Sequence, residues 1–247
     1  MPSIQVIYED NNFLAVNKPA GLLVHGFRVT VDGEKRHIAE STLVDWLLEK
    51  YPEIKGVGDL PRWRSGIVHR LDKQTSGVLL LAKNQEYFIY LKNLFKNHEV
   101  EKTYLALVKG RVEPKEGFIN KPIGLKPGTI KRTVFVKNAK MIKEALTEYK
   151  VKEYLPSPMA GLPEYSLLEV KPKTGRTHQI RVHLASIGHA VVGDPLYGGG
   201  KVEGFNRLFL HAYSLEFSPV PGKKLKLTAD LPPDLTQFLS SAKLASQ

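Results

Sequence analysis

A group of polar and titratable side chains immediately precedes a short apolar run in the first third of the chain. His69, Arg70 and Asp72 lie within four residues of one another, and Val78–Ala82 follows after a short polar turn. Loops that a buried strand holds in place commonly carry catalytic groups, and a carboxylate beside basic side chains suits acid–base or nucleophilic chemistry. The alternative is a plain turn in which Asp72 caps the following amides and Arg70 points to solvent.

A second basic and polar segment lies at residues 173–184. If a helix begins near residue 177, its spacing allows Arg181 to project inward against the core. A buried arginine needs a carboxylate partner, and we expect Asp72 to provide it. The alternative is that Arg176 and Arg181 are cations that contact phosphate groups.

Together, these segments resemble the RluA-like family of pseudouridine synthases. His69–Asp72 followed by Thr75–Gly77 resembles the catalytic-loop signature of that family, and residues 174–183 resemble its arginine-bearing motif. Supporting similarities occur, in the family's order, at residues 17–21, 102–104, 207 and 210–212. The resemblance extends from about residue 4 to about residue 233. It includes no S4-type RNA-binding module, and Ala190 stands where the family usually has proline.

The resemblance implies an isomerase that converts specific uridines of ribosomal or transfer RNA to pseudouridine. In that reaction the bond between N1 and C1′ breaks, and the base is rejoined to the sugar through C5. A uridine in a stem-loop must be extruded into a closed pocket for this to happen. No group is exchanged with a second substrate, so we expect no cofactor and no metal ion.

The resemblance also assigns roles to individual residues. Asp72 matches the catalytic aspartate, which could attack the sugar, attack the base or remove a sugar proton. Tyr104 matches the tyrosine that stacks under the flipped base, and Arg181 matches the arginine that pairs with the aspartate. Arg70 matches the residue that fills the space left by the extruded base. The candidate substrate-binding residues are therefore Lys18, His69, Arg70, Arg176 and His178.

Two other functions can be drawn from the same side chains. A phosphoesterase could collect a metal site from nitrogen and oxygen ligands. Its candidate ligands are His69, Asp72, His178, His183 and Asp194. The spacing of five between the last two histidines does not place them on one helical face, which argues against that site. The other alternative is an RNA-binding protein without catalytic activity.

The remaining sequence predicts the elements that hold these residues. Short β-like segments indicate strands at residues 4–8, 13–16, 78–82, 104–108, 133–136, 146–151, 165–170 and 225–229. Helical patterns occur at residues 43–47, capped by Ser41-Thr42, and at residues 86–97. We interpret residues 27–41 as an exposed loop and residues 240–247 as a flexible tail. The pattern predicts an α+β fold, a mainly antiparallel mixed sheet with helices and loops around a central catalytic cleft.

Composition and charge limit the remaining possibilities. The 247 residues are 42% hydrophobic and 25% charged, which predicts a folded chain, and we expect one domain over residues 1–247. The net charge of +11 favours a polyanionic partner such as RNA, the alternative being a lysine-rich surface that serves solubility. Cysteine is absent, which excludes disulfides and thiolate chemistry. The apolar runs are too short to span a bilayer, so we expect a cytoplasmic monomer without a membrane partner.

Overall fold

The computed structural model describes residues 3–26, 28–31, 34–37, 40–156 and 164–244. The chain divides into two compact units. Unit 1 contains Met1–Val100 and Leu215–Ala229, and unit 2 contains Glu101–Ser214 and Asp230–Gln247. The chain therefore passes from one unit to the other three times, and strand β13 (Leu210–Val220) contains one of these passages.

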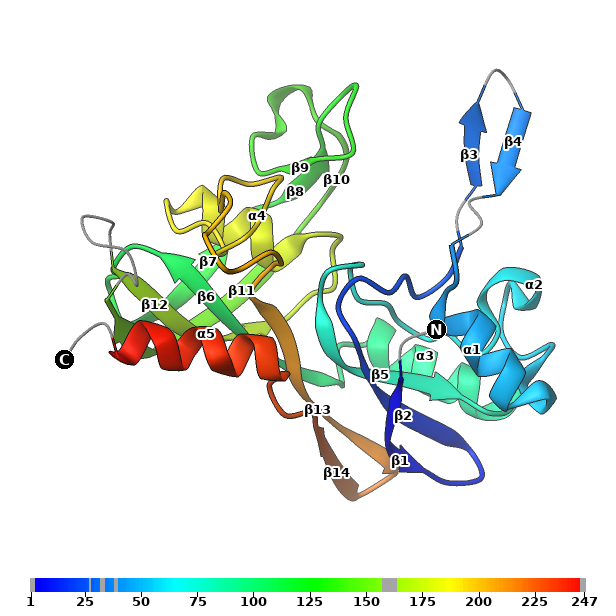
Figure 1. The fold of residues 1–247 in the computed structure, drawn as a ribbon. Coiled ribbons are helices and arrows are strands. Elements are labelled where there is room, and N and C mark those ends of the chain that lie inside the picture. Colours follow the sequence, from blue (N-terminus) through cyan, green and yellow to red (C-terminus); the bar gives the residue numbers. More distant parts are fainter. Residues whose placement is uncertain (1–2, 27, 32–33, 38–39, 157–163, 245–247) are drawn as a thin grey trace. The chain divides into compact units, whose positions relative to one another are not determined.

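Unit 1 is built on strands in the hydrogen-bonded order β1-β2-β5-β13, with β14 paired to β13. Its strands are β1 (Gln5–Glu9), β2 (Phe13–Lys18), β5 (Ser76–Ala82) and β14 (Lys223–Thr228). Every residue of β5 is buried, as its continuous apolar run predicts. Helix α3 (Gln85–Lys96) packs against β5 (Figure 1). This strand therefore gives the segment before it a rigid support.

The helices of unit 1 begin at side-chain caps. Thr42 caps α1 (Leu43–Lys50), and the carboxylate of Asp45 accepts a hydrogen bond from the Thr42 amide in return. The side chain of Asn84 accepts a hydrogen bond from the amide of Tyr87 at the start of α3. These caps confirm the two helices predicted near residues 43–47 and 86–97. Unit 1 also contains the helix α2 (Pro61–Arg64) and the 3₁₀ turn η1 (Pro52–Ile54).

Unit 2 is built on strands in the order β13-β6-β12-β11-β7. Three of its neighbouring pairs, β12–β6, β11–β12 and β11–β7, are antiparallel. The strands are β6 (Glu101–Lys109), β7 (Glu116–Asn120), β11 (Leu146–Leu155) and β12 (Tyr165–Pro172).

Helix α4 (Gln179–Ser186) of unit 2 buries Ile180 and Leu184 in one apolar cluster with this sheet. Helix α5 (Pro233–Leu244) places Leu235 and Phe238 in another cluster with Phe209. A separate sheet has the order β10-β8-β9, with β8 (Ile123–Leu125), β9 (Arg132–Thr133) and β10 (Lys140–Lys143).

Three local predictions are wrong. Residues predicted as a loop form a hairpin of β3 (Arg28–Val31) and β4 (Glu34–His37), which pairs through backbone bonds and needs no apolar pattern. The strand predicted at residues 133–136 ends at Thr133, because its hydroxyl accepts a hydrogen bond from the Phe135 amide and closes a turn; the 3₁₀ turn η2 (Val136–Asn138) follows. The predicted tail is helical up to Leu244, and residues 245–247 lie outside the described part of the chain.

The α+β class with mainly antiparallel pairing is confirmed. The single domain over residues 1–247 stays a prediction. In the part of the chain that the structure describes, no helix is both long enough and apolar enough to cross a bilayer.

Candidate active site

The loop that carries Asp72 is fixed in unit 1 immediately before β5. The amide of Thr75 donates a hydrogen bond to the carbonyl of Asp72 at 3.1 Å and closes a turn. The carbonyl of Lys73 accepts hydrogen bonds from the Gly21 amide at 2.8 Å and from Nζ of Lys18 at 3.1 Å. These bonds hold the backbone carbonyls of Asp72 and Lys73, and the side chain of Asp72 is half-buried.

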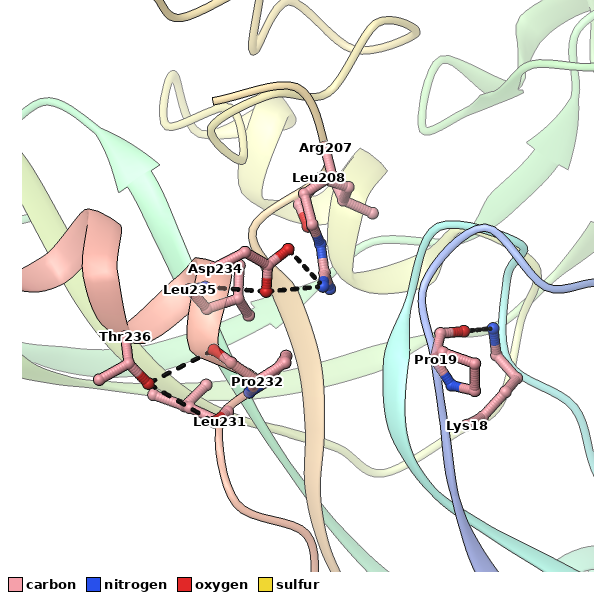
Figure 2. A network of polar contacts seen from close by, with 9 residues as sticks. All are labelled: Lys18, Pro19, Arg207, Leu208, Leu231, Pro232, Asp234, Leu235 and Thr236. Carbon is pink, nitrogen blue, oxygen red and sulfur yellow. Dashed lines mark hydrogen bonds and ion pairs between the residues drawn. The ribbon is translucent and has the colours of Figure 1, made fainter. Parts of the chain in front are cut away.

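Lys18 joins two loops of unit 1. Its side chain is fully buried, and its ammonium donates to the carbonyls of Pro19 and Leu22, each at 2.8 Å, as well as to Lys73. Figure 2 shows the ammonium turned back toward the Pro19 carbonyl. A buried ammonium needs such acceptors, and here they tie the turn at residues 19–22 to the Asp72 loop. Contact of Lys18 with RNA stays a prediction.

His69 orients the first half of the same loop. Its Nε2 accepts a hydrogen bond from the Leu80 amide of β5 at 2.9 Å, and its ring stacks on Phe95 of α3 with a centroid distance of 4.3 Å. An accepting Nε2 carries no proton, so the ring is the neutral tautomer with its proton on Nδ1. Arg70, the next residue, is exposed and free to reach a ligand in solution.

Arg181 lies on α4 in unit 2 and forms a bidentate ion pair with Asp194. Its Nε donates to Oδ2 at 2.7 Å and its Nη2 donates to Oδ1 at 2.8 Å. Its guanidinium also lies over the ring of Tyr197, 5.2 Å from the centroid. The sequence led us to expect Asp72 as the partner of Arg181 and missed Asp194 in this role. The pairing with Asp72, which belongs to unit 1, stays a prediction.

The carboxylate of Asp194 is itself held in place. Its Oδ1 accepts hydrogen bonds from the amides of Leu196 at 2.8 Å and Tyr197 at 3.2 Å. A side chain at Gly199 would place its Cβ 1.9 Å from the Val191 carbonyl and 2.9 Å from Cβ of Asp194, so only glycine fits there. Asp194 therefore presents both oxygens to Arg181 from a rigid turn.

Gln179 fixes the loop that leads into α4. Its Oε1 accepts hydrogen bonds from the Arg176 amide at 3.0 Å and from the Thr174 hydroxyl at 2.7 Å. Its Nε2 donates to the Leu146 carbonyl and to the Thr147 hydroxyl, both at 3.0 Å. Sequence reasoning gave Gln179 no role, because its contacts with Leu146 and Thr147 come from a strand distant in the sequence.

His178 sits in a strained backbone conformation at the start of α4. Its φ of 56° is left-handed, a conformation that costs a non-glycine residue about 1–3 kcal/mol and that clusters at functional sites. Its Nδ1 lies 2.9 Å from Oη of Tyr197, which also accepts a hydrogen bond from the Arg132 amide at 2.8 Å. This network connects the start of α4 to the Asp194 turn and to β9.

Two further candidates lie in unit 2. Tyr104 stands on β6 opposite Val170 of β12 and is partly buried against the apolar cluster of the main sheet. Burial lowers the pKa of its near neighbour Lys102, and the charge of Lys173 lowers it further. Nε of Arg176 donates a hydrogen bond to the Glu144 carbonyl at 3.0 Å, which ties this candidate to the end of the preceding loop. Contact of these side chains with RNA stays a prediction.

The histidine and carboxylate candidates for a metal site do not gather in the described part of the chain. No group of three or more such side chains there could hold a metal ion. His183 instead lies fully buried, with Nδ1 2.9 Å from the Thr147 hydroxyl and Nε2 3.0 Å from the Lys121 carbonyl. Burial lowers the pKa of His183, which favours the neutral ring.

Arg207, another position of the family resemblance, joins the segment before β13 to the start of α5. Its Nη1 donates to both carboxylate oxygens of Asp234, at 3.1 and 3.3 Å (Figure 2). Desolvation by burial lowers the pKa of Arg207, against the effect of Asp234. The contact supports the fold of unit 2.

Comparison with known proteins identifies the family. The sequence profile described as "RNA pseudouridylate synthase" matches residues 12–186, a range that includes Asp72, Tyr104 and Arg181. The chain belongs to this family. Pseudouridine synthases are isomerases that act on RNA, which confirms the resemblance, the enzyme class and the RNA substrate predicted from the sequence.

Named relatives and solved structures agree with this assignment. The chain is 37% identical over 241 residues to ribosomal large subunit pseudouridine synthase D of Borreliella burgdorferi, covering 96% of this chain and 68% of the relative. It is 34% identical over 242 residues to the protein of the same name from Zymomonas mobilis, covering 94% and 70%. The structure of human RNA pseudouridylate synthase domain containing 1 has a TM-score of 0.73 and 27% identity, covering 98% of this chain and 88% of that one. The pseudouridine synthase fold is therefore confirmed.

Proposed function

We propose that this pseudouridine synthase isomerises uridine in large-subunit ribosomal RNA. The names of the two bacterial relatives support this substrate class, and transfer RNA has no comparable support among them. The net charge of +11 supports a large polyanion as substrate. We further propose that the modified uridine lies in a stem-loop, and that the enzyme acts in the cytoplasm as a monomer.

Asp72 is the catalytic carboxylate in this proposal. The observation that carries it is the double anchoring of its loop, to β5 through His69 and to residues 18–21 through Lys73. A reacting group must stay within a fraction of an ångström of its productive position, and a loop held at both ends meets that need. The carboxylate acts while the N1–C1′ bond breaks and the C5–C1′ bond forms. The C5 proton then leaves, and N1 gains a proton.

Arg181 and Tyr104 assist from unit 2. The guanidinium of Arg181 favours the charged form of a neighbouring carboxylate, and Asp194 holds that guanidinium in a fixed orientation. The ring of Tyr104 supports the extruded base from below by stacking. Arg70 fills the space that the base leaves in the stem.

The test combines mapping in cells with an assay of the pure enzyme. Pseudouridines in ribosomal and transfer RNA are mapped by chemical labelling in a deletion strain, with the gene absent and restored. One or more sites in large-subunit RNA should disappear with the gene and return with it. Release of tritium from C5-labelled uridine then measures turnover by the pure protein. Loss of sites only from transfer RNA, or no tritium release, would contradict the proposal.

A further inference from the structure

Residues 123–143 form a structural feature that the proposed catalytic roles do not use. They comprise β8, β9, β10 and the connecting loops, and they are called the small sheet below. A cluster that includes Ile123, Ala145 and Val182 of α4 joins the small sheet to the rest of unit 2. Figure 1 shows the small sheet beside α4. It is therefore attached to the helix that carries Arg181.

The small sheet is the most basic part of the chain. Its 21 residues contain six cations and no acidic residue, whereas the whole chain carries a net charge of +11. More than half of the net charge thus belongs to less than a tenth of the length. The six cations are Lys126, Lys131, Arg132, Lys137, Lys140 and Lys143.

The lysines of the small sheet have no carboxylate partners among the described residues. All five are exposed. The lysines of the neighbouring main sheet are different, because each of four faces a glutamate. Those pairs are Lys150–Glu116, Lys152–Glu169, Lys171–Glu101 and Lys173–Glu148. A cationic surface without internal neutralisation attracts a polyanion more strongly than one whose charges are paired.

Exposed apolar side chains occur among these cations. The three most exposed large apolar residues of the described chain are Phe135 at 84%, Ile130 at 74% and Met141 at 69%. All three lie in the small sheet. The amide of Phe135 donates a hydrogen bond to the Thr133 hydroxyl at 3.1 Å, so a defined turn presents the ring. An exposed ring beside cations is suited to stack an unpaired base.

Arg132 provides a second, independent observation. Its Nε is enclosed and has no hydrogen-bond partner among the described residues. Buried polar atoms are almost always satisfied, so an orphan donor of this kind requires an explanation. The backbone of Arg132 is fixed by the bond from its amide to Tyr197. The Nε donor is therefore unused within the fold, and the partly exposed Arg132 adds a sixth cation to this surface.

We propose that the small sheet is a second RNA-binding surface. A single-stranded stretch of the substrate RNA outside the modified stem-loop places its phosphates against the lysines and one base on Phe135. Protein interfaces are depleted in lysine, so a surface with five lysines and no acid fits RNA better than a protein partner. The substrate identity rests on the proposed function, but the binding of RNA can be measured without turnover.

The first experiment removes charge. Lys126→Gln/Lys131→Gln/Lys137→Gln is compared with Lys223→Gln/Lys224→Gln/Lys226→Gln on β14, which removes the same charge from exposed positions of unit 1. The probe is a fluorescent uridine stem-loop with a single-stranded extension, titrated at several salt concentrations. Loss of three phosphate contacts should reduce the slope of log affinity against log salt by about 2, while the control keeps the wild-type slope. Equal slopes for the two variants would overturn the proposal.

The second experiment removes the ring. Phe135→Ala should weaken binding of the extended probe by at least about fivefold, because stacking of one base contributes that much or more. The same variant should bind the stem-loop without its extension as the wild type does. Ile89→Ala, at an exposed position of α3, is the control and should change neither affinity. If Phe135→Ala binds both probes like the wild type, the surface does not stack a base and the proposal fails.

The two proposals fail in different ways. At saturating RNA, the lysine variant should keep the wild-type rate of tritium release while its KM rises. If the wild type releases no tritium but the lysine variant still loses affinity, the proposed function is wrong and the RNA surface stands. If turnover is normal and both variants bind RNA normally, the RNA surface is wrong and the proposed function stands.

Discussion

Asp72 combines a half-buried carboxylate with a backbone that is hydrogen-bonded at Asp72 itself and at Lys73. Asp72→Asn keeps the shape of the side chain and removes its charge and nucleophilicity, so tritium release should fall below detection. RNA affinity should stay the same or rise slightly, because a negative charge near phosphates has been removed. Single-turnover kinetics and binding titrations check both results. The control is Asp59→Asn, an exposed carboxylate of unit 1, which should keep full turnover. Substantial turnover by Asp72→Asn would disprove its role.

The ion pair of Arg181 and Asp194 is buried on both sides, with side-chain exposures of 7% and 0%. Arg181→Ala or Asp194→Ala leaves one charge without its partner, which typically costs about 3–5 kcal/mol of unfolding free energy. The double variant should cost less than the sum of the two single variants. Chemical denaturation measures all three.

The pair of Arg207 and Asp234, in which only the carboxylate is well exposed, provides the control for this experiment. The side chain of Asp234 is 50% exposed, so Asp234→Asn should cost less than about 1 kcal/mol. If Asp194→Ala cost no more than Asp234→Asn, the carboxylate of Asp194 would not be what holds Arg181.

His183 makes the stability of unit 2 depend on pH. Burial lowers its pKa below the ordinary value of 6.5, so the unfolded chain binds a proton at a higher pH than the folded chain. Its contribution is complete above about pH 6.5 and is lost as the pH falls toward the lowered pKa of the folded state. His183→Gln should therefore flatten the loss of unfolding free energy between about pH 7.5 and about pH 5. His25, whose pKa burial also lowers, keeps its own contribution in that variant. An unchanged pH profile would contradict the effect.

At the scale of elements, local sequence patterns correctly predicted those strands and helices whose formation depends on one segment alone. The five apolar residues of Val78–Ala82 can be satisfied only by burial on both faces, and β5 is buried throughout. Helix α1 follows from its cap and its apolar face. Asp194 could not be paired with Arg181 in this way, because it lies 13 positions further along the chain, in a turn whose shape depends on Gly199. The partners of a site are set by tertiary structure, while its motifs are local.

Helix α5 shows a signal that the sequence contained and that we misread. Its apolar positions 235, 238 and 242 have helical spacing, but they cross the point where the composition becomes small and polar. Because residues 240–247 were interpreted from their composition alone, they were wrongly predicted to form a flexible tail. The hairpin of β3 and β4 had no comparable signal, because backbone pairing does not require an apolar face.

Ala242 tests whether α5 is packed as the structure describes. The residue is fully buried among the side chains of an apolar cluster, whereas its neighbour Ser241 is exposed. Ala242→Glu should lower the unfolding free energy by several kcal/mol, since a buried charge without a partner is costly. Ser241→Glu should change it by less than about 0.5 kcal/mol. Chemical denaturation compares them, and equal effects would mean that α5 does not pack against the cluster.

At the scale of the whole molecule, the path of the chain predicts how the protein unfolds. Each unit is built from two separate stretches of sequence, and β13 contributes residues to both. The two parts of each unit are joined only through the other unit, so a unit that folds alone must first bring together two ends separated by that segment. We therefore expect a single cooperative transition, which agrees with the prediction of one catalytic domain.

Differential scanning calorimetry tests this expectation directly. The calorimetric enthalpy should equal the van't Hoff enthalpy of one transition. Ser214→Pro provides a sharper test, because Ser214 is a buried residue of β13 at the boundary between the units. Proline within a sheet removes a backbone donor and destabilises the strand, so the whole transition should move to lower temperature without splitting. Two resolved transitions in the wild type would show that the units fold separately. So would a variant in which one transition shifts and a second one does not.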